Sequence, residues 1–166
     1  NLKADTVDRV YGFIFDRLKV VLKESGIQHN VVNAMTATDQ DIQDVYRKIK
    51  VLDEFLKTDE GQKLLSAQRR IKNIVQSNSE TETDNALFYE NEEIVLREKT
   101  ENLETDLLQT RDFREQLTLC AQMNDVIANF FEKILINTDN ERLRRNRLNL
   151  VTKLDFVFET VIPRGL

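Results

Sequence analysis

The sequence predicts an all-α fold, a bundle of helices, and three observations support this class. The 166 residues include only four glycines and one proline, so few residues would interrupt a helix. Hydrophobic residues make up 40% of the chain, enough for a buried core. They recur at spacings of three and four, the helical period. We therefore expect about six helices with short connections, forming a single domain over residues 1–166.

The first helix is expected over residues 6–24, with Asp5 or Thr6 as its N-terminal cap, because both side chains can accept a backbone hydrogen bond. Ser25 and Gly26 end it. Apolar residues on one side of this helix predict the face that packs on the core: Val7, Val10, Ile14, Leu18, Val21 and Leu22.

Three further helices are expected next. A brief helix lies near residues 31–35, and a long helix over residues 39–58 is capped by Thr38 or Asp39. The core stripe of the long helix is Ile42, Val45, Ile49, Leu52 and Leu56. The following helix covers residues 61–76, and its core stripe is Leu64, Ala67, Ile71, Ile74 and Val75.

A polar segment over residues 77–85 has no hydrophobic side chain and is the best candidate for a mobile loop. An acidic helix is expected after it, over residues 88–109. Between positions 80 and 106 the chain holds ten acidic and two basic residues, a net charge of −8. Because the whole chain carries −5, the remainder carries +3. The acidity is therefore local and does not exclude an anionic partner.

The last part of the sequence predicts an apolar helix over residues 111–136 and a final helix capped by Thr138 or Asp139. The core stripe of the final helix is Leu143, Leu150, Leu154, Val157, Phe158 and Val161. Arg147 falls within this stripe, where an unpaired guanidinium would be costly to bury. We expect Arg147 to bind a carboxylate or the carbonyl groups at a helix end.

Two basic helix faces are candidates for binding RNA. The final helix carries, opposite its core stripe and next to Lys153, the residues Arg142, Arg145, Asn149 and Phe156. The helix over residues 61–76 carries Arg69, Arg70, Lys72 and Asn73. Arginine binds phosphate and aromatic rings stack on unpaired bases. Solvated helix surfaces, with Phe156 covered by another helix, would show the same pattern.

No catalytic residue and no metal site is predicted. His29 is the only histidine, which excludes a two-histidine metal site in this chain. Cys120 lies among apolar residues and is expected to be a buried structural thiol. No apolar run approaches the roughly 20 residues that span a bilayer. A single cysteine suits a reducing cytoplasm, and the start at Asn1 suggests a fragment of a longer protein.

Three stretches carry a resemblance to a known family: residues 11–35, 47–75 and 128–154. The matching positions are Asp16, Arg17 and Leu18, then residues 67–75, then Phe130 and Phe131 with Leu143, Arg144, Asn146, Arg147 and Leu148. From about residue 7 onward, the chain resembles the C-terminal end of the beta subunit of bacterial two-subunit glycyl-tRNA synthetases. That end is a helical anticodon-binding domain named for a DALR motif.

The resemblance implies that the chain binds the anticodon loop of glycine tRNA. It implies that an alpha subunit of the same hetero-oligomer carries out aminoacylation with ATP and magnesium, and that this chain holds no cofactor. Acidic residues between positions 80 and 106 would face away from the RNA. Residues expected to face the RNA are Arg69, Arg70, Lys72, Asn73, Arg142, Arg145, Asn149 and Phe156. Motif positions with an architectural role would be Arg144, Arg147, Phe130 and Phe131.

The chain departs from the family pattern at two motif positions. Glu132 stands where the family has aspartate, and ERLR at residues 141–144 replaces DALR. Two alternatives stay open. One is a helical bundle that binds another protein through its acidic helix, and the other is the anticodon-binding domain of another synthetase, such as the arginyl enzyme.

Overall fold

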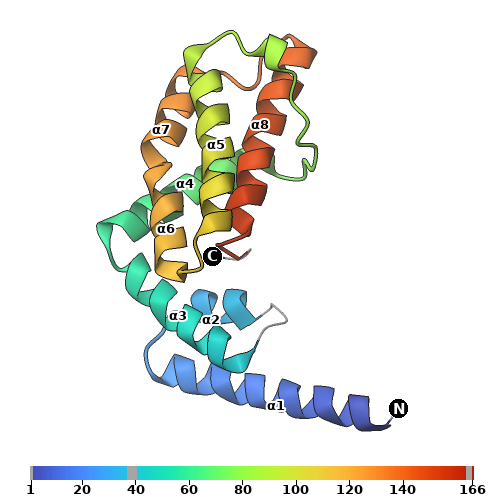
Figure 1. Ribbon diagram of the computed structural model, residues 1–166, viewed down its shortest axis with the longest axis vertical. Coiled ribbons are helices and arrows are strands. Elements are labelled where there is room, and N and C mark those ends of the chain that lie inside the picture. The colour runs from blue at the N-terminus through green and yellow to red at the C-terminus, as the bar shows by residue number, and fades with distance from the viewer. Residues whose placement is uncertain (1, 37–40, 164–165) are drawn as a thin grey trace. The chain divides into compact units, whose positions relative to one another are not determined.

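The computed structural model describes residues 2–36, 41–163 and 166 (Figure 1). Within these residues the chain forms eight α-helices, one 3-10 turn and no strand, which confirms the all-α prediction. The helices are α1 (Leu2–Glu24), α2 (His29–Thr36), α3 (Ile42–Leu56), α4 (Asp59–Val75), α5 (Asn91–Gln109), α6 (Phe113–Gln122), α7 (Asn124–Lys133) and α8 (Glu141–Glu159). The 3-10 turn η1 covers Asn85–Leu87.

The chain divides into two compact units. The first comprises Asn1–Glu54 with Pro163–Leu166, and the second comprises Phe55–Ile162. A single domain over residues 1–166 therefore remains a prediction.

In the first unit, α1 packs on α2. The predicted caps of α1 are wrong, because the helix begins at Leu2 and places both residues inside it. Of its predicted core stripe, Leu22 is 1% exposed, whereas Val7, Val10, Ile14 and Val21 are exposed. Gly26 ends the helix with a φ of 88°, a conformation that favours glycine. The predicted caps of the next long helix, Thr38 and Asp39, lie outside the described residues.

In the second unit, α5 lies between α7 and α8, and α4 packs against α6, α7 and α8 (Figure 1). The core lies between these helices and includes the fully buried side chains of Ile71, Leu117, Phe130, Leu150 and Phe158. Thr58 caps α4 by accepting a hydrogen bond from the Gly61 N–H at 3.1 Å. Because α7 and α8 both pack on α4, side chains from all three helices can meet at one place on the surface.

Two predictions about the C-terminal helices are wrong. The helix expected over residues 111–136 is two helices, α6 and α7, with Met123 between them. The N–H of Met123 bonds the carbonyl of Cys120, a contact one residue shorter than the α-helical one, so the helix ends there. The cap of α8 is Asn140, whose Oδ1 accepts from the N–H groups of Arg142 and Leu143 at 3.1 and 3.2 Å.

Candidate nucleic-acid interface

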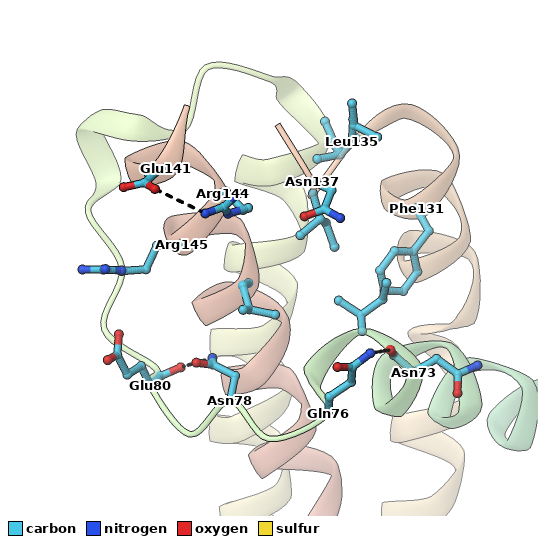
Figure 2. A pocket seen from close by; sticks show the side chains of 14 residues that line it. Asn73, Gln76, Asn78, Glu80, Phe131, Leu135, Asn137, Glu141, Arg144 and Arg145 are labelled. Carbon is cyan, nitrogen blue, oxygen red and sulfur yellow. Dashed lines mark hydrogen bonds and ion pairs between the residues drawn. The ribbon is translucent and has the colours of Figure 1, made fainter. Parts of the chain in front are cut away.

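A groove of about 670 Å³ lies where the end of α4 meets α7 and the first turns of α8 (Figure 2). We call it the α4–α8 groove. It is lined by Asn73, Ile74, Gln76, Asn78, Glu80, Phe131, Ile134, Leu135, Ile136, Asn137, Glu141, Arg144, Arg145 and Leu148. Asn73 and Arg145 come from the two basic faces that the sequence predicted separately. The fold therefore brings one residue of each face to the same groove.

Part of the groove is apolar. Ile74 is 37% exposed and lines it, so the prediction that Ile74 lies in the core is wrong. Phe131 is half-buried, and its ring meets the ring of the buried Phe130 edge to face at 5.5 Å. Leu135, from the segment between α7 and α8, is 69% exposed. These side chains offer an apolar surface to a flat ring.

The polar side of the groove carries two arginines of α8. Arg144 Nη2 lies 3.7 Å from Glu141 Oε1, and Figure 2 marks this loose ion pair. Arg145 extends on the side away from Phe131 (Figure 2). Within the described part of the chain, the Arg145 side chain is exposed and forms no ion pair. Its guanidinium is therefore free to bind an anion.

Two smaller hollows adjoin the groove. One of about 590 Å³ shares Asn73, Ile74 and Phe131 with it and adds Arg70. The other, of about 440 Å³, shares Glu141 and Arg145 and adds Arg142, Asn146 and Asn149. The surface from Arg70 to Arg142 is therefore continuous through shared residues. Arg69 is exposed on α4 but lines none of these hollows.

The acidic residues near the groove do not all face away from it. Glu80 lines the groove, and Asp84 Oδ2 lies 3.8 Å from Arg142 Nη2. The first residues of the acidic stretch thus border the groove, and whether the stretch faces away from RNA stays a prediction. Glu98 and Glu101 on α5 are exposed and line none of the three hollows.

Asn149 does not lie on the exposed face where the sequence placed it. It is 4% exposed, and its Nδ2 donates to the carbonyl of Glu82 at 2.7 Å. Asn146 acts in the same way, since its side chain accepts from the N–H of Asp84 at 2.6 Å and donates to the Asp84 carbonyl at 3.1 Å. Amide side chains of α8 therefore hold the segment over residues 76–84 against the helix.

Lys72 and Phe156 lie apart from the groove. Lys72 is half-buried, and its Nζ lies 2.7 Å from Glu159 Oε1 and 3.6 Å from Asp155 Oδ1. Phe156 is 39% exposed, so no helix covers it fully, but it lines a separate hollow with Lys153. Neither Lys72 nor Phe156 therefore lines the groove that contains Arg145.

Arg147 has the partners that its position in the core stripe predicted. It is 7% exposed; its Nε donates to the carboxylate of Glu93 on α5, and its Nη1 donates to the carbonyl of Leu135 at 2.8 Å. Leu135 comes two residues after the end of α7. A carboxylate and a carbonyl near a helix end both bind this guanidinium.

Sequence reasoning did not find several residues of the groove. Asn78 and Asn137 stand in loops, where neither helical period nor charge marked them. Asn78 Nδ2 donates to Thr152 Oγ1 at 2.7 Å, a contact between residues far apart in the sequence. Ile74 stands beside Val75 at the edge of the apolar stripe of α4, and helical period alone does not decide which of the two is buried. Asn146, which lines the adjoining hollow of about 440 Å³, belonged to the matched motif, and that motif was the one available signal for it.

Three other features of the described residues concern metal binding, the reactivity of the thiol and the spanning of a membrane. Among the described residues, no three histidine, cysteine, aspartate or glutamate side chains gather as a metal site would require. Burial raises the pKa of the Cys120 thiol to about 12. No helix in the described ranges combines the length and the apolar character needed to cross a bilayer.

The chain is similar to part of a tRNA ligase subunit. No family model matches it. It is 33% identical over 163 residues to the glycine–tRNA ligase beta subunit of Phenylobacterium zucineum, covering 92% of this chain and 24% of that protein. The beta subunit of Cereibacter sphaeroides is 34% identical over 157 residues, covering 84% and 22%. That of Clostridioides difficile is 26% identical over 164 residues, covering 96% and 23%. The chain thus spans about a quarter of the length of these curated relatives.

Proposed function

We propose that this chain is the anticodon-binding domain, of the DALR type, of a glycine–tRNA ligase beta subunit. The α4–α8 groove binds the anticodon loop of glycine tRNA. One observation carries the proposal: Asn73 of one basic face and Arg145 of the other line a single groove with Phe131. Similarity to named beta subunits along most of the chain supports it.

The chemistry of the groove suits an unpaired loop. Bases of a single-stranded loop turn outward and stack on aromatic or apolar side chains, which Phe131 and Ile74 offer. The exposed guanidinium of Arg145 is placed to bind a phosphate. Side-chain amides such as Asn73 and Asn137 can both donate to and accept from base edges.

The complete enzyme would divide its work between subunits. Aminoacylation with ATP and magnesium would belong to the alpha subunit of a cytoplasmic hetero-oligomer, and this chain would contribute binding of tRNA. Arg145, Arg144 and Asn73 would act only in recognition.

The test compares the groove with the anticodon in the complete alpha–beta enzyme. Binding of glycine tRNA and of an anticodon-substituted glycine tRNA is measured for the wild type and for Arg144→Gln/Arg145→Gln. Arg111→Gln is the control, because Arg111 is exposed and lines none of the three hollows of this surface. If the groove reads the anticodon, the two changes together weaken binding by less than the product of their separate effects. Fully independent effects, or no effect of the groove variant, would contradict the proposal.

A further inference from the structure

A buried ion pair lies directly behind one wall of the α4–α8 groove. Arg147 of α8 donates to Glu93 of α5 and to the carbonyl of Leu135. Leu135 belongs to the connector, by which we mean residues 134–140 between α7 and α8. Leu135, Ile136 and Asn137 of the connector line the groove. Figure 2 shows Leu135 and Asn137 across the groove from Arg144.

Glu93 is itself held in place. It is completely buried, and its Oε2 accepts from the N–H groups of Tyr89 and Glu90, both at 3.0 Å, as part of the capping box that begins α5. Its other oxygen accepts from Arg147. The guanidinium of Arg147 is therefore fixed relative to the first turn of α5. Because it also bonds the Leu135 carbonyl, it fixes the position of that carbonyl as well.

The connector has few other attachments. Its Ile134 side chain is buried, but Leu135 is 69% exposed and Asn137 is exposed. Among the described residues, the bond from Arg147 is the one hydrogen bond that a side chain of another element makes to the backbone of residues 134–140. The Arg147 guanidinium thus supplies, among the described residues, the one side-chain hydrogen bond from another helix that fixes the backbone of this wall.

We propose that Arg147 and Glu93 are positioning residues for RNA binding: they place the connector wall of the groove and do not contact the RNA. This inference rests on the proposed function. Arginine is required because its planar fork reaches two acceptors at once, Nε toward Glu93 and Nη1 toward Leu135. A lysine would keep the charge beside Glu93, but its three donors radiate from one nitrogen on a flexible stem, so it would not reproduce the fixed directions of the fork toward Glu93 and Leu135.

The experiment uses the complete alpha–beta enzyme and glycine tRNA. For Arg147→Lys we expect binding about tenfold weaker, the effect of one lost hydrogen bond on the wall. The salt dependence of binding should keep its wild-type slope, because no phosphate contact is removed. Hydrogen exchange at the amides of Ile134 and Thr138, which bond the carbonyls of Phe130 and Ile136, should increase. Arg145→Gln is the comparison: it should reduce the slope by about 0.7–0.9 and leave that exchange unchanged.

A second variant separates positioning from general loss of stability. Leu117 is buried in the core on α6, and α6 contributes no residue to the groove. Leu117→Val should therefore destabilise the fold, but it should not weaken tRNA binding at temperatures where the protein is folded. If Leu117→Val weakens binding as much as Arg147→Lys does, the positioning role is wrong. A reduced salt slope in Arg147→Lys would also overturn it, because it would mean direct contact with phosphate.

The two proposals fail in different ways. If Arg145→Gln weakens binding and Arg147→Lys does not, the groove binds RNA but the Arg147–Glu93 pair has no part in it. If neither variant changes binding, the proposed function fails and the positioning role fails with it. Only weaker binding by Arg147→Lys, with an unchanged slope and faster exchange at the amides of Ile134 and Thr138, supports the inference.

Discussion

Lys72 of α4 and Glu159, the last residue of α8, form an ion pair with 2.7 Å between Nζ and Oε1. Asp155, one turn earlier on α8, adds a second carboxylate at 3.6 Å. This pair joins two helices whose packing forms the core of the second unit. The charge of Lys72 is thereby satisfied within the protein, in contrast to that of Arg145.

The first prediction concerns Lys72→Gln. We expect the free energy of unfolding to fall by about 1 kcal/mol or less, because the pair is partly exposed to solvent. The salt dependence of tRNA binding should not change, since a phosphate would have to displace two carboxylates. Urea denaturation and binding measured over a range of salt concentrations check both statements. A slope reduced as much as that of Arg145→Gln would show that Lys72 binds RNA after all.

The second prediction concerns Asn149→Ala. Because the Asn149 amide is buried and donates to the Glu82 carbonyl, its removal should lower the free energy of unfolding by about 1–3 kcal/mol. Asn129→Ala is the matched control, since Asn129 is exposed on α7 and should change stability by at most about 0.5 kcal/mol. Urea denaturation of both variants measures the difference. Equal stabilities of the two variants would refute the structural role of Asn149.

The third prediction concerns Gly61 in the first turn of α4. A Cβ atom there would lie 2.1 Å from the carbonyl oxygen of Phe55 and 2.6 Å from Leu56 Cα, so backbone would have to move. Gly61→Ala should destabilise the protein by about 1–3 kcal/mol or more. Gly12→Ala is the control: nothing lies within 4 Å of a Cβ at Gly12, and in a helix this change should stabilise by about 0.5–1 kcal/mol. The melting temperature should fall for Gly61→Ala and rise for Gly12→Ala; an unchanged or higher melting temperature of Gly61→Ala would contradict the close approach at Gly61.

The fourth prediction concerns Cys120. Burial raises the pKa of its thiol from 9.0 to about 12, so the native protein should react with iodoacetamide at pH 8 far more slowly than the unfolded chain. The unfolded chain loses this proton near pH 9 and the native protein only near pH 12. Between these values the contribution of Cys120 to the free energy of unfolding should therefore decrease as pH rises. Rapid labelling of the folded protein would show that the thiol is accessible.

The helical period predicted correctly which side chains of α8 are buried and which are exposed where this depends on that helix alone. It placed Leu150, Leu154 and Phe158 in the core, and it required a partner for Arg147 because a charge in an apolar stripe is costly. It placed Arg142 and Arg145 at the surface, where the structure has them.

Contacts between elements account for the errors. Asn149 is buried by the segment over residues 76–84, whose position on α8 no periodicity encodes. Ile74 and Val75 are both apolar, and the end of α7 leaves Ile74 exposed in the groove. The break at Met123 depends on a tight turn between two helices that each continue the apolar pattern. Whether Arg69, Arg70 or Phe156 contacts RNA remains a prediction.

Residues 82–84 are held to α8 through their main chain, whereas Asn78 is held through its side chain, whose Nδ2 donates to Thr152 Oγ1. The amides of Asn146 and Asn149 bond backbone atoms of Asp84 and Glu82 and do not bond their side chains. Every residue except proline offers the same backbone N–H and carbonyl groups. Replacement of Glu82 would therefore leave this attachment in place and change only the charge along one border of the surface.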